Sequence, residues 1–120
     1  MEIFIKVINY KEIEPVMFDT DVAKGITARV LIGKDDGANN FCMRAFEISE
    51  NGHTPRHSHD WEHEIFIHAG SGEVLLGDEW KPMTAGSAIF IPGNVEHQMK
   101  NTDSEPLVAI CLVPSGAPEL

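Results

Sequence analysis

The chain has 120 residues, of which 42% are hydrophobic and 23% are charged, as is typical of a single globular domain and not of a disordered chain. Its 9 basic and 19 acidic residues give a formal charge of −10, which argues against binding to nucleic acid or to an anionic membrane and favours a small cation. No apolar run approaches the ~20 residues of a membrane span. Met1–Tyr10 lacks a signal-peptide cleavage pattern, so we expect a cytoplasmic protein.

In chain order, the first segment that could hold a helical turn is Tyr10–Phe18, and Pro15 interrupts it. Short β-rich runs between Gly, Pro and Asn turns follow. They are Ala28–Ile32, Phe41–Ile48, Glu64–His68, Glu73–Leu76, Ser87–Ile91, His97–Lys100 and Leu107–Val113. Short strands at this spacing are typical of an all-β sandwich or barrel. Neither a repeat nor a linker divides the chain, so the sequence predicts one all-β domain over residues 1–120.

Histidines are the most informative residues, because five of the six lie within the 16 residues from His53 to His68. Residues i and i+2 of a strand share a face, so we expect His57 and His59 on one side, with His63 at the same parity. His97 would share a face with Met99 on a later strand. Imidazoles inside a barrel are costly unless something binds them. Since imidazole is the commonest ligand of first-row divalent metals, this pattern predicts a metal site.

The histidine spacing resembles the cupin superfamily. Its first motif, Gly-x5-His-x-His-x3,4-Glu-x6-Gly, is similar to Gly52, His57, His59, His63 and Gly70, with one residue fewer after the first glycine. Its second motif, Gly-x5-Pro-x-Gly-x2-His-x3-Asn, is matched by Gly86, Pro92, His97 and Asn101, with Asn94 at the second glycine position. The resemblance implies a cupin barrel (double-stranded β-helix, or jelly roll) with its motifs near residues 52–70 and 86–101.

The glutamate position of the first motif is occupied by His63, and the alternative ligand is Glu64, which has the opposite parity. The run Arg56–Phe66 resembles a monocupin subgroup with four histidines around manganese. This resemblance implies that His57, His59, His63 and His97 hold one divalent metal, with manganese expected and iron, nickel, copper or zinc as alternatives. It also implies a homodimer.

Three functions stay open at this point. The first is a small-molecule oxidoreductase, similar to a dioxygenase, because an octahedral ion with four protein ligands keeps two open positions. The second is a non-redox isomerase or lyase, and the third is a ligand-binding or sensing protein without catalysis. A fold shared by enzymes and non-enzymes does not decide among them.

Residues that alternation turns inward would form a substrate pocket, and these are Ile91, Met99, Ala109 and Cys111. Trp61 either packs in the bend between ligands or touches substrate. Arg44 and Arg56 either anchor an anionic substrate near the mouth or belong to surface ion pairs. Cys42 and Cys111 form no spaced motif and are expected to be reduced and buried.

Overall fold

The computed structural model describes residues 4–120, and within them the chain folds into nine β-strands with two short 3₁₀ turns, Tyr10–Glu12 and Lys34–Asp36. The strands are β1 (Val16–Phe18), β2 (Lys24–Ile32), β3 (Phe41–His53), β4 (His63–Ala69), β5 (Ser71–Leu76), β6 (Glu79–Thr84), β7 (Ala88–Ile91), β8 (His97–Asn101) and β9 (Leu107–Pro114). The prediction of an all-β fold is therefore confirmed.

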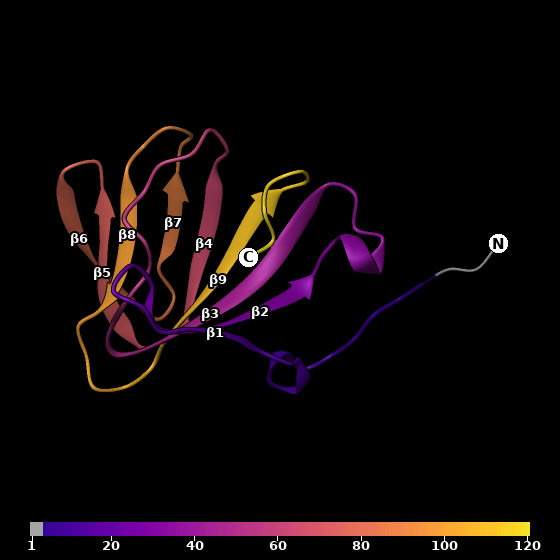
Figure 1. The fold of residues 1–120 in the computed structure, drawn as a ribbon, viewed down its shortest axis with the longest axis horizontal. Helices are drawn as coiled ribbons and strands as arrows, with labels where there is room; N and C mark the ends of the chain where they lie inside the picture. The colour runs from indigo at the N-terminus through magenta and orange to yellow at the C-terminus, as the bar shows by residue number, and fades with distance from the viewer. Residues whose placement is uncertain (1–3) are drawn as a thin grey trace.

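The strands form one sheet in the order β6-β5-β8-β3-β9-β4-β7. β2 also pairs with β3, and β1 pairs with β2. Figure 1 shows this sheet curled, so that its two sides face each other. All the pairings are antiparallel, including the long ladder between β3 and β9 that sets Arg44 opposite Cys111. This register fixes which side chains line the interior.

Each of the seven strand segments expected from the sequence overlaps one strand, and two further strands lie outside them. β6 escapes prediction because Pro82 lies within it, and proline is tolerated only where a strand has an unpaired edge. β6 is indeed the last strand at one end of the sheet order. The other, β1, has only three residues and directly follows Pro15. The Tyr10–Glu12 turn agrees with the expected single helical turn before that proline.

The interior is packed by alternate residues of the strands. Its fully buried side chains include Ile48, Ile67, Leu107 and Val113. Asn101, the last residue of the second motif, is also buried, and its amide donates to the carbonyls of Ile48 (2.9 Å) and Glu105 (2.8 Å). This asparagine therefore closes the turn after β8 and has no part in the site described below.

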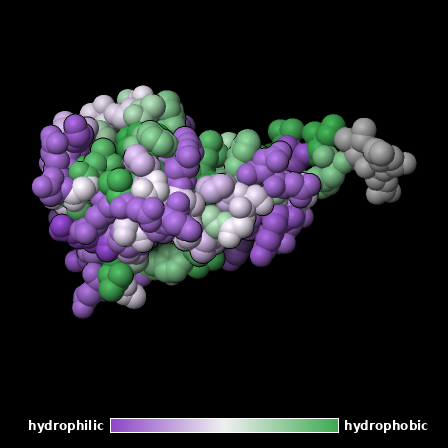
Figure 2. Space-filling view, turned by 90° about the horizontal axis from the view of Figure 1, so that it is seen from above, coloured by the Kyte–Doolittle hydropathy of each residue, from purple (hydrophilic) through white to green (hydrophobic). Residues whose placement is uncertain are grey.

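Residues 4–15, which precede β1, extend away from the barrel as an arm (Figure 1). Apolar side chains cover part of this arm (Figure 2), where Phe4, Ile5 and Val7 are 69%, 79% and 95% exposed. The homodimer stays a prediction, for which this arm offers apolar surface. Residues 4–120 contain no helix with the length and hydropathy needed to span a bilayer.

Candidate metal centre and cavity

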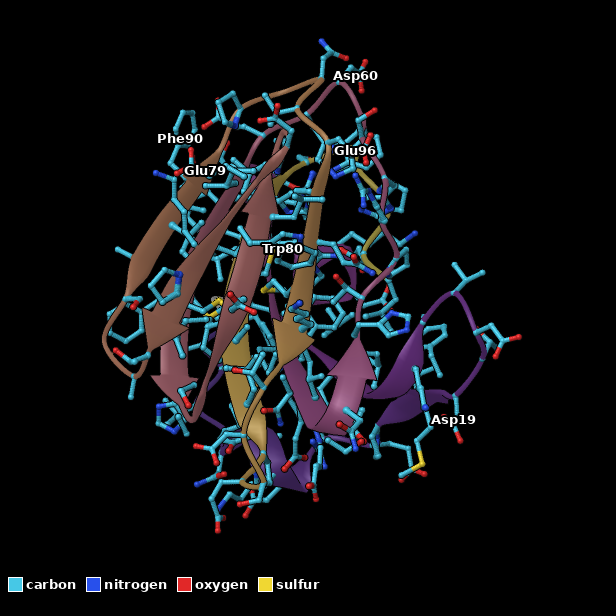
Figure 3. The ribbon with its side chains drawn as sticks, turned by 90° about the vertical axis from the view of Figure 1, so that its left-hand side faces the viewer. Asp19, Asp60, Glu79, Trp80, Phe90 and Glu96 are labelled. Carbon is cyan, nitrogen blue, oxygen red and sulfur yellow. The ribbon has the colours of Figure 1, made fainter. Side chains whose placement is uncertain are left out.

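The histidines converge from three different elements. His57 and His59 lie in the loop between β3 and β4, His63 begins β4, and His97 begins β8. Figure 3 shows Asp60, in that loop, and Glu96, directly before His97, at the same end of the barrel. The expectation of a strand at His57 and His59 is wrong, because this segment makes only a single bridge, in which the backbone N–H of each of His57 and His97 donates to the other's carbonyl.

The loop is held in place by the Pro92–Asn94 turn. Asn94 adopts φ 65°, a conformation that asparagine tolerates better than most residues, and its N–H donates to the His59 carbonyl at 2.6 Å. A Cβ on Gly93 would lie 2.5 Å from the Asp60 carbonyl oxygen, so this position requires glycine for the close approach of the two segments. The altered spacing of the second motif thus still orients His59.

The imidazoles are close enough to share one ion. Ligand nitrogens of His57, His59 and His97 lie within 4.8 Å of one another, so these three histidines are positioned to bind a metal. His63 is also adjacent, with its Nε2 2.7 Å from Nε2 of His59. Two ligands at right angles around an ion, each at about 2.1 Å, would be ~3 Å apart, which is similar to that distance.

Backbone carbonyls orient two of the rings. Nδ1 of His97 is 2.8 Å from the Val95 carbonyl, and Nδ1 of His59 is 2.8 Å from the Trp61 carbonyl. Each carbonyl favours a proton on Nδ1, which leaves the lone pair on Nε2. Nε2 of His97 is buried and has no hydrogen-bond partner within residues 4–120. Since a buried acceptor without a partner is unfavourable, the site fits a metal ion at this nitrogen.

Burial favours the neutral form of two of the imidazoles, His63 and His97. Burial is the largest cause of a pKa of about 3 for His63, and the nearby Arg44 guanidinium and the neighbouring imidazoles contribute to the same shift. Burial also lowers the pKa of His97, although the Val95 carbonyl partly opposes that shift. A metal binds the neutral form of histidine, so the folded protein presents these two rings in the form a metal requires.

This preference predicts how the metal-free protein responds to pH. The unfolded chain takes up protons near the ordinary histidine value of 6.5, whereas folded His63 does so only near 3. The unfolded state therefore binds more protons between these values, and the free energy of unfolding should be largest above pH 6.5 and fall as the pH is lowered. Urea unfolding of chelator-treated protein at pH 7 and pH 5 measures this effect. Equal stability at both values would contradict it, and a His63→Gln variant should show a smaller difference.

Glu64, the alternative to His63, lies on the other face of β4. The burial along β4 alternates, with His63, Ile65 and Ile67 buried and Glu64 exposed. We therefore predict that His63→Ala weakens metal binding by at least about tenfold and that Glu64→Gln leaves it unchanged, because only His63 faces the other imidazoles. Competition against a chelating dye measures both affinities. A larger loss in Glu64→Gln than in His63→Ala would contradict this assignment.

A cavity of about 440 Å³ opens beside the four imidazoles, all of which line it. Three residues of the predicted pocket, Ile91, Met99 and Cys111, are among its walls. Ala109 is fully buried but is absent from the lining, so its place in the pocket is wrong. Most of the remaining wall is apolar, with Phe18, Ile26, Phe46, Trp61 and Ile65 as its larger side chains.

The chain matches the family model described as "Cupin domain" over residues 45–113, which is more than half of its length. This protein is a cupin. It is similar to the polyketide cyclase RemF from Streptomyces resistomycificus, with 33% identity, a TM-score of 0.85, and coverage of 92% of this chain and 79% of that one. A predicted oxalate decarboxylase from Thermotoga maritima is 21% identical, with a TM-score of 0.81 and coverage of 92% and 99%, and that likeness shows the fold alone. No curated protein sequence matches the chain.

In this cupin, the structure decides between the alternatives left open for Trp61 and for Arg56. Trp61 packs, because its indole stacks on the His59 ring with the centroids 4.1 Å apart and the planes within 4°. It also lines the cavity. Arg56 is exposed and forms an ion pair with Glu96, so it belongs to the surface. Cys42 and Cys111 are buried and free of disulfides, as predicted.

The sequence did not decide whether Arg44 lies at the cavity or in a surface ion pair. It lies on β3, it is only 7% exposed, and it lines the cavity beside His63. It shares strand parity with Cys42 and Phe46, and an arginine between apolar residues at i±2 was a signal available in the sequence. Of the two arginines considered, the buried one is therefore the cavity residue.

Proposed function

We propose that this cupin is a divalent-metal enzyme that catalyses a non-redox reaction of a small carbonyl compound able to form an enol. The observation that carries the proposal is the cluster of imidazoles at the wall of a largely apolar cavity of about 440 Å³. A cavity of this size is in the range that small-molecule sites occupy. The proposed metal ligands are His57, His59, His63 and His97.

The similarity to a polyketide cyclase supports this reaction class. RemF is a third identical to this chain, and cyclisation of a polyketide joins an enolisable carbon to a carbonyl carbon. Such a reaction needs no change in oxidation state. When bound, a divalent ion would supply Lewis-acid polarisation of a carbonyl oxygen, and four neutral ligands would leave its full charge available for that purpose.

The protein's own residues would orient the substrate and keep water from it. Phe18, Phe46 and Ile65 form apolar walls against which a carbon skeleton can pack. The stacked Trp61 ring holds the His59 imidazole in one orientation. A fixed His59 ring and apolar cavity walls together favour one bound geometry of the substrate.

The sulfur atoms beside the site favour non-redox chemistry over the oxidoreductase alternative. Cys111 Sγ lies 3.0 Å from Nδ1 of His63, and the Met99 side chain lines the same cavity. Thiols and thioethers are oxidised by activated oxygen species. An enzyme that turned over dioxygen here would expose both groups at every cycle.

The proposal is tested by hydrogen–deuterium exchange at the acidic carbon of ethyl acetoacetate, followed by NMR. Protein stripped of metal and reloaded with either zinc or manganese should accelerate exchange without dioxygen, and His97→Ala should not. Acceleration by both ions under anaerobic conditions supports Lewis-acid catalysis. Turnover that requires manganese or iron together with consumption of dioxygen would replace it by the oxidative alternative.

A further inference from the structure

Arg44 is a buried cation without a carboxylate partner. Its Nη2 donates to Cys111 Sγ at 3.0 Å, and Nη1 donates to the Glu119 carbonyl at 3.4 Å. Nε is buried and has no hydrogen-bond partner among residues 4–120. The guanidinium carbon lies 4.8 Å from the centroid of the Phe46 ring. Each of these contacts is with a neutral group, so none of them balances the charge.

Among the described residues that line the cavity, the one acidic group is the terminal carboxylate of Leu120, and it forms no ion pair with Arg44. No ion pair within residues 4–120 includes Arg44, and the cavity lining contains no aspartate or glutamate. Buried charges in proteins are as a rule paired, because an unpaired one is strongly unfavourable. The chain has a formal net charge of −10, yet the Arg44 guanidinium lies in its cavity without an ion-pair partner. The most direct compensation is an anionic ligand.

The position of Arg44 indicates which part of the ligand it contacts. Its Nη2 is 3.4 Å from Nδ1 of His63, whose Nε2 faces the other imidazoles. One imidazole ring therefore separates the guanidinium from the candidate metal position. An anionic group at Arg44 and a carbonyl oxygen at the metal would be only a few bonds apart in one molecule.

We infer that Arg44 binds a carboxylate of the substrate, so that the substrate is a short-chain keto acid unit in which carboxylate and enolisable carbonyl are close together. The carbonyl part of this inference rests on the proposed function, whereas the carboxylate contact depends on Arg44 alone. Guanidinium suits this role because its planar array of donors matches a carboxylate, and Nε is available for it.

Isothermal titration of zinc-loaded protein with acetoacetate and with methyl acetoacetate tests the inference. These probes differ only at the carboxyl group, which is ionised in acetoacetate and a neutral methyl ester in the other. Charge-assisted hydrogen bonds from a buried arginine should make acetoacetate bind roughly ten- to a hundredfold more tightly than the ester. In Arg44→Met the preference for acetoacetate should fall by about tenfold or more, because only the acid loses a charged contact with the guanidinium.

Two further variants make the result specific. Arg56→Gln removes an exposed arginine near the same mouth and should keep the full preference for the acid, because Arg56 is paired with Glu96. Arg44→Lys keeps the charge but loses the planar array, so it should retain only part of the preference. It also gives a result if the methionine variant does not fold. Zinc content is measured for every variant, so that loss of the ion is not mistaken for loss of the contact.

The outcomes separate this inference from the proposed function. An unchanged preference for acetoacetate in zinc-loaded Arg44→Met, or no preference in the wild-type protein, would overturn the role of Arg44. If methyl acetoacetate then still undergoes exchange at its acidic carbon, the proposed function stands without it. If acetoacetate binds through Arg44 and no exchange is catalysed, the carboxylate site stands and the reaction class fails.

Discussion

We expect His97→Ala to lose almost all of its metal, from near one ion per chain to less than about a tenth. His97 alone comes from β8, whereas the other imidazoles belong to the continuous stretch from His57 to His63. Its buried Nε2 has no other partner within the described chain. Structural zinc sites bind with roughly 10–16 kcal/mol, so one ligand of four accounts for about 3 kcal/mol, or about a hundredfold in affinity. Mass spectrometry of untagged protein dialysed against a weak chelator measures the stoichiometry.

His68→Ala is the matched control for this loss. His68 is an exposed residue of β4, in edge contact with Tyr10, and it lies outside the cavity. Its removal should leave the metal content unchanged, because it faces away from the imidazole cluster. Full metal occupancy in His97→Ala, or equal losses in the two variants, would mean that these imidazoles do not form the binding site.

Gly70→Ala should destabilise the fold by more than about 3 kcal/mol. Gly70 joins β4 to β5 with φ 85°, a conformation that costs a residue with a Cβ about 1 kcal/mol. The added Cβ would also lie 2.3 Å from the Pro106 carbonyl oxygen, and this backbone atom cannot rotate away as a side chain would. Relief requires β4 and the start of β9 to separate. The free energy of unfolding in urea measures the loss.

Gly77→Ala separates the two causes. Gly77 has a similar φ of 71°, but apart from its own atoms and those of its chain neighbours, no atom of residues 4–120 lies within 4 Å of the position that its Cβ would take. Only the cost of the positive φ remains, so the free energy of unfolding of this variant should fall by about 1 kcal/mol. Equal losses in Gly70→Ala and Gly77→Ala would show that the contact with Pro106 relaxes at no cost.

The fold could be predicted from local patterns because each strand is short and bounded by a turn. Alternation within β4, from His63 to Ala69, appears directly in its burial. β6 could not be predicted, because Pro82 is compatible with a strand only at a sheet edge, and edge position depends on the pairing of the whole sheet. Local sequence carries no information on that pairing.

The site was predictable as a set of residues but not as a geometry. The spacing of His57, His59, His63 and His97 is sufficient to select them, and they do lie together. The reason for their convergence differs from strand parity, since His57 and His59 are in a loop fixed by its bridge to β8 and by the Asn94 turn. Burial of Arg44 depends on the register that sets it opposite Cys111, a long-range pairing that periodicity does not reveal.

The stacking of Trp61 on His59 has a practical consequence. Indole emission is sensitive to an adjacent ring, and this ring is a candidate metal ligand 4.1 Å away. The second tryptophan, Trp80, is on β6 beneath the Lys100 ammonium and does not line the cavity. Filling of the site should therefore alter the intrinsic fluorescence of one tryptophan and not of the other. A Trp80→Phe background would turn the protein into its own optical reporter of occupancy, readable without a dye or a substrate.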